Sequence, residues 1–101
     1  MQSYGMLRAR LSPRAQTALD QIREFCLSLD DCVVEDIRAH RVVYGKTIAF
    51  RWFADVKPEE SQIIVRIQRD WRQEPLIITT PYGGDVGPVQ EQIRAAYDNM
   101  R

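Results

Sequence analysis

The spacing of apolar residues changes twice along this chain of 101 residues, and no other feature constrains its fold as strongly. Apolar side chains recur every three or four residues between positions 13 and 29 and again between 88 and 100, which is the spacing of amphipathic helices. Between residues 33 and 80 they alternate, as in strands that bury one face. The order predicts a helix, a run of strands and a second helix.

Both predicted helices begin at residues that suit a first turn. Ser12 can accept a hydrogen bond from a free backbone amide, and Pro13 fits the first helical position, where its missing N–H costs nothing. Pro88 fits the same position in the second helix, with Asp85 or Gly87 near the cap. The two apolar faces consist of Ala15, Leu19, Ile22, Cys26 and Leu29 in the first helix, and of Val89, Ile93, Ala96 or Tyr97, and Met100 in the second.

Extended segments are predicted at residues 33–37, 40–46, 47–53, 62–68 and 76–80. In 47–53, Ile48, Phe50 and Trp52 are expected on the helix-covered face, and Arg51 with Phe53 on the other. The polar stretch 54–61 is interpreted as a hairpin loop, because it is too short for a parallel crossover. The predicted fold is therefore α+β: an antiparallel sheet with the N-terminal and C-terminal helices packed on one face, a two-layer sandwich whose other face is partly open. Residues 1–11 are interpreted as a flexible N-terminal segment, and 12–101 as a single domain.

Charge and composition exclude several classes of protein. The net charge is zero and the isoelectric point is near 6.6, so no global positive potential attracts nucleic acid or anionic lipid. The chain shows neither a signal peptide nor a run of about 20 apolar residues, so a cytoplasmic location without membrane contact is expected. Cys26 and Cys32 lack redox or zinc-site spacing and are interpreted as small hydrophobic residues.

Parts of the chain resemble a known family. The resemblance rests on segments 47–50 and 53–56 and on Val89, Ile93, Ala96, Tyr97 and Asp98 of the closing helix. In these residues the chain resembles a small uncharacterised domain described as predicted transport protein, which also occurs as a C-terminal module of nuclease-like proteins. The shared layout extends to the YjbR-like and frataxin-like helix-sheet-helix domains, some of which are thought to bind DNA or iron. The resemblance implies a fold rather than a reaction. The segment between Ile67 and Leu76 is shorter here than in the family, so a ligand site in that loop is not implied.

No catalytic constellation is predicted. The single histidine, His40, lies between Arg38 and Arg41 without a nucleophile nearby, and adjacent carboxylates point apart along a strand. The chain is therefore not expected to be an enzyme, to use a cofactor or to hold a metal. The acidic run 30–36 corresponds to the place where frataxin-like domains hold metal, but it lacks histidine and a denser set of acids. The segment 81–88, "PYGGDVGP", is interpreted as a turn in preference to an anion-binding loop, because Asp85 would repel an anion.

Basic residues gather where the sheet is expected. Residues 37–53 carry a charge of +4, whereas residues 20–36 carry −5. Arginines beside aromatic rings on an open sheet face suit phosphate backbones and stacked bases. The alternative interpretation is that these arginines pair with acids and keep the face solvated. The candidate binding residues are Arg41, Lys46, Arg51, Arg66, Arg69 and Trp71.

Two functions remain open. The first is a non-catalytic binding or accessory module that contacts nucleic acid or a protein partner through the open sheet face. The second is a self-associating structural domain, a homodimer in which Phe53 and Ile64 bury that same face.

Overall fold

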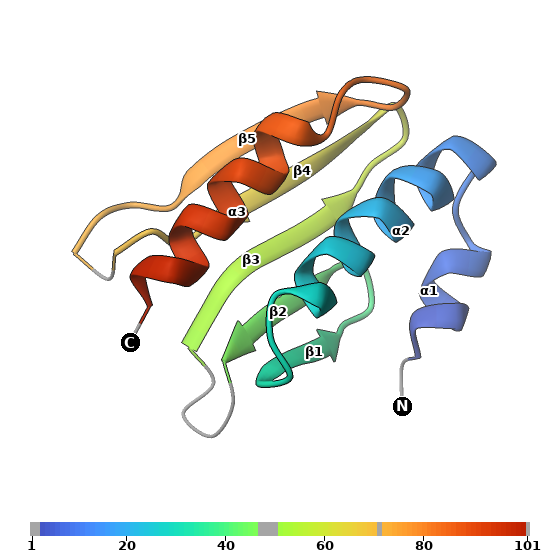
Figure 1. Ribbon diagram of the computed structural model, residues 1–101. Helices are drawn as coiled ribbons and strands as arrows, with labels where there is room; N and C mark the ends of the chain where they lie inside the picture. Colours follow the sequence, from blue (N-terminus) through green and yellow to red (C-terminus); the bar gives the residue numbers. More distant parts are fainter. Residues whose placement is uncertain (1–2, 47–50, 71, 101) are drawn as a thin grey trace.

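The computed structural model describes residues 3–46, 51–70 and 72–100 (Figure 1). Among these residues, two helices precede five strands, and a third helix follows them. Their bounds are α1 Tyr4–Ala9, α2 Pro13–Ser28, β1 Val33–Ile37, β2 Val42–Lys46, β3 Arg51–Pro58, β4 Gln62–Ile67, β5 Leu76–Pro81 and α3 Gly87–Asn99.

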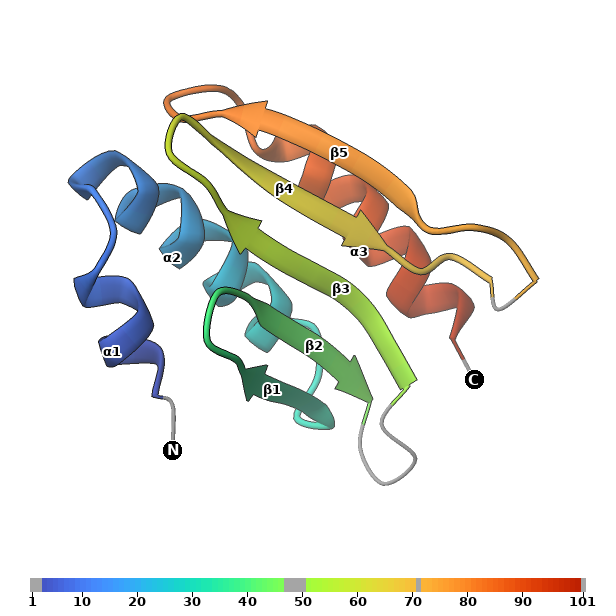
Figure 2. The ribbon, with the colours of Figure 1, turned by 180° about the vertical axis from the view of Figure 1, so that it is seen from behind.

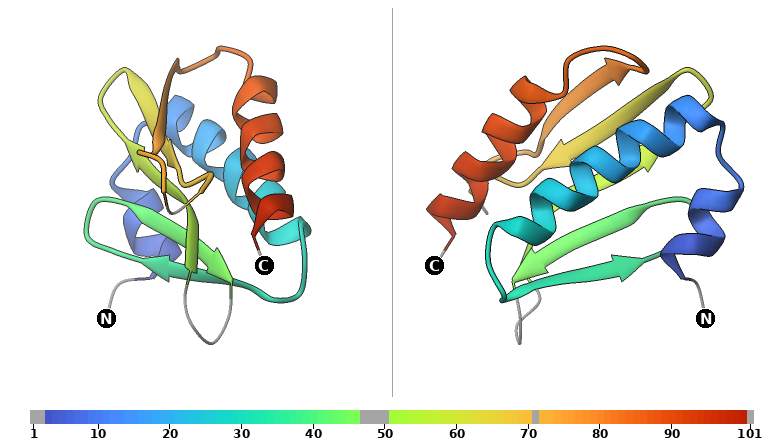
Figure 3. Two further views of the ribbon diagram at one scale, coloured as in Figure 1. Left: turned by 90° about the vertical axis from the view of Figure 1, so that its left-hand side faces the viewer. Right: turned by 45° about the vertical axis from the view of Figure 1, so that its right-hand side comes forward.

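The five strands form one antiparallel sheet in the order β1-β2-β3-β4-β5. Helices α2 and α3 cover the same face of this sheet, whereas the opposite face carries no helix within the described residues (Figure 2). Viewed edge-on, the molecule has a helical layer and a sheet layer (Figure 3). The predicted α+β two-layer sandwich is therefore confirmed, including its open face.

The helix ends follow from the residues that cap them. The Ser12 hydroxyl accepts a hydrogen bond from the Ala15 amide at 3.3 Å, and α2 begins at Pro13 as predicted. The Asp85 carboxylate accepts a hydrogen bond from the Gly87 amide at 2.8 Å, at the start of α3. This carboxylate occupies the helix start that an anion-binding loop would need. The turn predicted for 81–88 is found at residues 82–86, because Pro81 belongs to β5 and Gly87 and Pro88 belong to α3.

The core lies between the sheet and the two long helices. Leu19 and Ile22 of α2 and Ile93 of α3 are completely buried, and they meet strand residues that alternate along β4. In that strand Ile63, Val65 and Ile67 are buried while Ile64 and Arg66 face outward, as the period of two predicts. Phe53 packs edge-to-face against Tyr97 of α3, with ring centroids 5.4 Å apart.

Residues 4–9 form a helix that the sequence interpretation of 1–11 as a flexible segment did not anticipate. Leu7 of α1 is buried in the core. The Tyr4 hydroxyl donates to Asp20 of α2 at 2.6 Å, and the Arg8 guanidinium forms an ion pair with the same carboxylate at 2.9 Å. A helix of this length is marginal alone, so its contacts with α2 account for its presence.

The loop expected at 54–61 is wrong for residues 54–58, because β3 continues through Pro58. Ala54 and Val56 are buried and pair with Ile67 and Val65 of β4. Pro58 ends the strand. It lies beyond Val56, the last residue of β3 that pairs with β2, so its missing N–H breaks no hydrogen bond of the ladder. Of the predicted strand 47–53, residues 51–53 are confirmed, and residues 47–50 lie outside the described part of the chain.

None of the described helices is both long and apolar enough to cross a membrane.

Candidate ligand-binding site

A β-bulge in β3 decides which side chains reach each face of the sheet. Tyr44 of β2 pairs with Ala54, but the next residue, Gly45, pairs with Trp52, so Phe53 is the extra residue. Phe53 and Ala54 consequently both belong to the core. Beyond the bulge, the face assignment predicted for Arg51, Trp52 and Phe53 is wrong, because it assumed strict alternation.

Arg51 lies on the helix side of the sheet. It pairs with Lys46, and paired residues of an antiparallel ladder share a face. The Lys46 amino group lies 4.3 Å from the ring centroid of Tyr97 in α3. The face that Lys46 and Arg51 share is therefore the one that the helices cover. Trp52 points the other way, since the Arg66 guanidinium of the open face lies 5.5 Å from its ring centroid.

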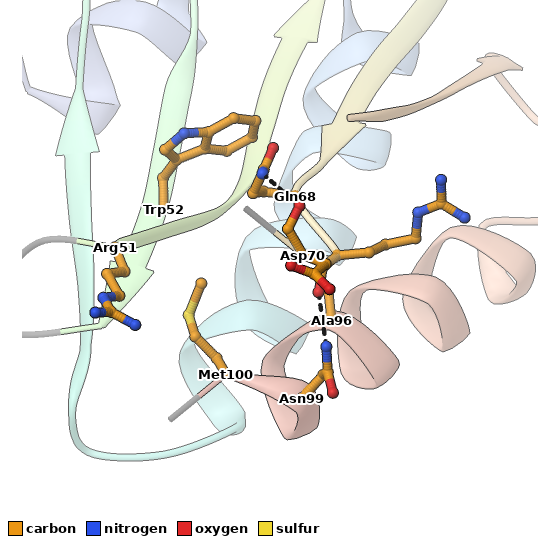
Figure 4. A pocket seen from close by; sticks show the side chains of 8 residues that line it. Arg51, Trp52, Gln68, Asp70, Ala96, Asn99 and Met100 are labelled. Atoms are coloured by element: carbon orange, nitrogen blue, oxygen red, sulfur yellow. Dashed lines mark hydrogen bonds between the residues drawn. The ribbon is translucent and has the colours of Figure 1, made fainter. Parts of the chain in front are cut away.

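A hollow of about 750 Å³ opens where β3 begins, β4 ends and α3 ends (Figure 4). Arg51 and Trp52 border it from β3, and the end of α3 closes it from the other side. The complete lining consists of Arg51, Trp52, Gln68, Arg69, Asp70, Ala96, Asn99 and Met100. A volume of this size is within the usual range of pockets that hold small molecules, roughly 300–1,000 Å³.

Two hydrogen bonds hold the segment that follows β4 in place. The Asn99 side-chain amide donates to the carbonyl oxygen of Arg69 at 2.9 Å, which ties this segment to α3. The Gln68 amide donates to the carbonyl oxygen of Asp70 at the same distance (Figure 4). The backbone that carries Arg69 is therefore attached to the end of α3, and the hollow has a fixed wall.

Two of the residues that line the hollow are arginines without an ion pair among the described residues. Arg51 and Arg69 are exposed, and neither forms an ion pair within the described part of the chain. The single acid in the lining, Asp70, accepts a hydrogen bond from the Arg72 backbone amide at 3.0 Å. Two arginines, Trp52 and the apolar Met100 thus line the same hollow.

The centre of the open face has a different electrostatic character. Arg41 and Arg66 both approach one oxygen of Asp55, at 2.9 and 3.4 Å, and the Asp55 side chain is only 9% exposed. Val43, which pairs with Asp55, is buried although it belongs to this face. The two arginines therefore neutralise an acid on this face, as the alternative interpretation of the basic residues described.

The six predicted binding residues consequently separate into groups. Arg51 and Arg69 border the hollow, whereas Arg41 and Arg66 lie on the open face with Asp55. Lys46 does not line the hollow, but it donates to the carbonyl oxygen of the lining residue Met100 at 3.2 Å. Trp71 lies outside the described residues.

The acidic residues at 30–36 are engaged in separate contacts. Asp30 accepts a hydrogen bond from the Tyr97 hydroxyl at 2.6 Å, which lowers the pKa of its carboxyl group. Glu35 binds Arg23 at 2.8 Å, and Asp36 binds Arg38 at 3.0 Å. Among residues 3–46, 51–70 and 72–100, no three histidine, cysteine or acidic side chains gather in a way that could hold a metal ion.

Cys26 is completely buried, and this burial raises the pKa of its thiol, so it is suited to packing rather than to nucleophilic chemistry.

Six lining residues were not among the predicted candidates: Trp52, Gln68, Asp70, Ala96, Asn99 and Met100. Strict alternation predicts Trp52 on the core face, and the bulge reverses this. Asn99 and Met100 lie at the end of a helix, and nothing in their spacing indicates that the helix ends beside β3.

No family model, curated protein or solved structure matches this chain. The resemblance to the predicted transport protein family therefore stays a prediction, and the geometry of the molecule itself must support any proposal on function.

Proposed function

We propose that this chain is a non-catalytic binding module whose hollow takes one nucleotide of a single-stranded nucleic acid. The observation that supports this most directly is that Arg51 and Arg69, neither ion-paired within the described residues, line the same hollow as Trp52. Guanidinium groups bind phosphate oxygens with two parallel hydrogen bonds, and an indole ring stacks on any base.

The geometry favours a single strand over a duplex. A base can reach the Trp52 ring only when it is unstacked from its neighbours, as in single-stranded segments. The hollow is concave and about 750 Å³ in volume, which suits one nucleotide with its phosphates rather than the side of a double helix. The neighbouring open face offers little free positive charge to a duplex, since Arg41 and Arg66 share Asp55.

The affinity is expected to be modest and to depend on salt. The net charge of zero provides no long-range attraction, so binding relies on the two arginines of the hollow. For single strands each neutralised phosphate contributes about −0.7 to the slope of log K against log salt, so two contacts predict a slope of about −1.4.

The proposal includes the expectations of a cytoplasmic location and of a role without catalysis. A homodimer through the open face receives less support than the sequence suggested, because Phe53 is fully buried against Tyr97 and cannot join such an interface.

Fluorescence anisotropy of a short labelled oligothymidylate tests the proposal. Arg51→Glu and Arg69→Glu are each expected to weaken binding by about tenfold, and Trp52→Ala by a similar factor, because stacking on one ring contributes about 1–3 kcal/mol. Arg94→Glu is the matched control, since Arg94 is exposed on α3 and does not line the hollow. The absence of binding at low salt, or an equal loss with Arg94→Glu, would contradict the proposal.

A further inference from the structure

The free edge of β5 is the least protected part of the sheet. β5 is the last strand in the sheet order, and its sequence, LIITTP, contains no charged residue. The opposite edge strand, β1, contains Glu35 and Asp36. Natural proteins commonly protect edge strands with charges, because unpaired N–H and C=O groups attract a further strand. Charge therefore protects one edge of this sheet and not the other.

Apolar side chains at this edge are left partly exposed on both faces. Ile77 points to the open face and is 62% exposed, the largest value among the large hydrophobic residues described. Leu76 and Ile78 point to the helix side, where they pack against the core but are only partly buried. Helix α3 packs mainly on β3 and β4, so the helical layer does not fully cover β5.

The hydrogen-bonding direction of each β5 residue follows from the ladder. The Tyr82 amide donates to the Ser61 carbonyl at 3.3 Å, toward β4. Because this direction alternates along an antiparallel strand, Thr80, Ile78 and Leu76 also bond to β4. Ile77 and Thr79 therefore direct their N–H and C=O groups away from the sheet.

Prolines limit this free edge at both ends. Pro81 also occupies an outward-pointing position, where its missing N–H leaves the ladder with β4 intact, and Pro75 precedes the strand. The available edge is consequently short, and a strand added there could not extend into a long continuous pairing.

We propose that β5 pairs with β5 of a second copy of this chain, antiparallel and around a two-fold axis at Ile77. A strand without charge meets an identical strand without like-charge repulsion. In this register the two Ile77 residues exchange N–H and C=O bonds, and each Thr79 N–H donates to the Pro75 carbonyl of the other copy. Leu76 of one copy then lies beside Ile78 of the other on the helix side, so all three partly exposed apolar residues gain cover.

A second copy fits this edge better than the open face. The centre of that face is occupied by the Arg41–Asp55–Arg66 group, and association there would bury three charged side chains. Edge pairing leaves this group in water and joins the two sheets into one. The proposal does not depend on ligand binding, since the hollow is bordered by β3, the segment after β4 and α3 rather than by β5.

Sedimentation equilibrium over a range of protein concentrations tests the pairing. The unmodified chain is expected to form dimers, and Ile77→Lys to raise the dimer dissociation constant at least about tenfold, because it places two ammonium groups at the axis. Val34→Lys is the matched control: Val34 is an exposed apolar residue of the other edge strand, and its substitution should leave the constant unchanged.

A second variant tests the backbone bonds without adding charge. Thr79→Pro removes an outward N–H while keeping the bonds to β4, so it should weaken the dimer yet preserve the circular dichroism of the folded chain. Thr80→Pro removes an N–H that bonds to β4 and should instead destabilise the fold. A strictly monomeric unmodified chain, or dimers that withstand both Ile77→Lys and Thr79→Pro, would overturn the proposal.

Discussion

The β-bulge at Phe53 can be tested by comparing two alanine substitutions in neighbouring positions. Phe53 is completely buried and packs edge-to-face on Tyr97, so Phe53→Ala removes a core ring and leaves a cavity. Such substitutions cost about 3–5 kcal/mol. Trp52 lies on the open face, where solvent can fill the space that its ring leaves, so Trp52→Ala should cost only about 2 kcal/mol from lost apolar contact.

Thermal unfolding followed by circular dichroism measures this difference. In a chain of this size each kcal/mol corresponds to a change in Tm of about 4–8 °C, so a difference of about 1–3 kcal/mol should place the Tm of Phe53→Ala at least roughly 4 °C below that of Trp52→Ala. Strict alternation would reverse the order, since it places Trp52 in the core and Phe53 on the open face. An equal or larger loss of stability with Trp52→Ala would therefore refute the bulge, and with it the position of Arg51 beside the hollow.

Three further predictions concern polar contacts. Tyr44→Phe should lower the free energy of unfolding by about 1.5–3 kcal/mol in urea titrations, because the buried hydroxyl donates to the Glu35 carboxylate at 2.8 Å; an unchanged urea midpoint would contradict this. The hydrogen bond from Arg8 lowers the pKa of Asp20, so the stability that this carboxylate adds is complete above its unfolded pKa of about 4 and is lost as pH falls through the folded value. Asp20→Asn should flatten this acid dependence of the urea midpoint, and an unaltered profile would exclude the contribution. Burial raises the pKa of Tyr97 to about 12, so its contribution to stability is complete below the unfolded value near 10 and is lost as pH rises toward 12. Ultraviolet absorbance should show a late-titrating tyrosine that is missing in Tyr97→Phe, and an identical titration curve in the variant would argue against this assignment.

The layered architecture could be predicted from the sequence because it depends on the periodic spacing of apolar residues. The alternation of Ile63, Val65 and Ile67 with polar neighbours predicted β4 and its buried face correctly. Ser12 and Pro13 indicated the start of α2, which the structure confirms. Each of these features depends on residues close together in the chain, whose effects propensity and capping describe well.

The candidate site could not be predicted to the same extent. It depends on one inserted residue in β3 and on contacts between segments that are far apart in the sequence. A bulge shifts the faces of β3 by one position, and the pattern of residues 51–56 contains no glycine or other mark of it. The partner of each arginine is set across strands: Arg41 and Arg66 meet Asp55, whereas Arg51 and Arg69 meet no acid among the described residues. Only the register of the sheet distinguishes these two pairs of arginines.

Titration of the isotopically labelled chain with a short oligothymidylate, followed by heteronuclear NMR, tests the central claim most directly. The account predicts that signal changes cluster at Arg51, Trp52, Arg69 and Asn99, around the hollow, and spare the Val43 region of the open face. Changes centred on Val43 and its neighbours, or a spectrum that is unaltered at low salt, would contradict it.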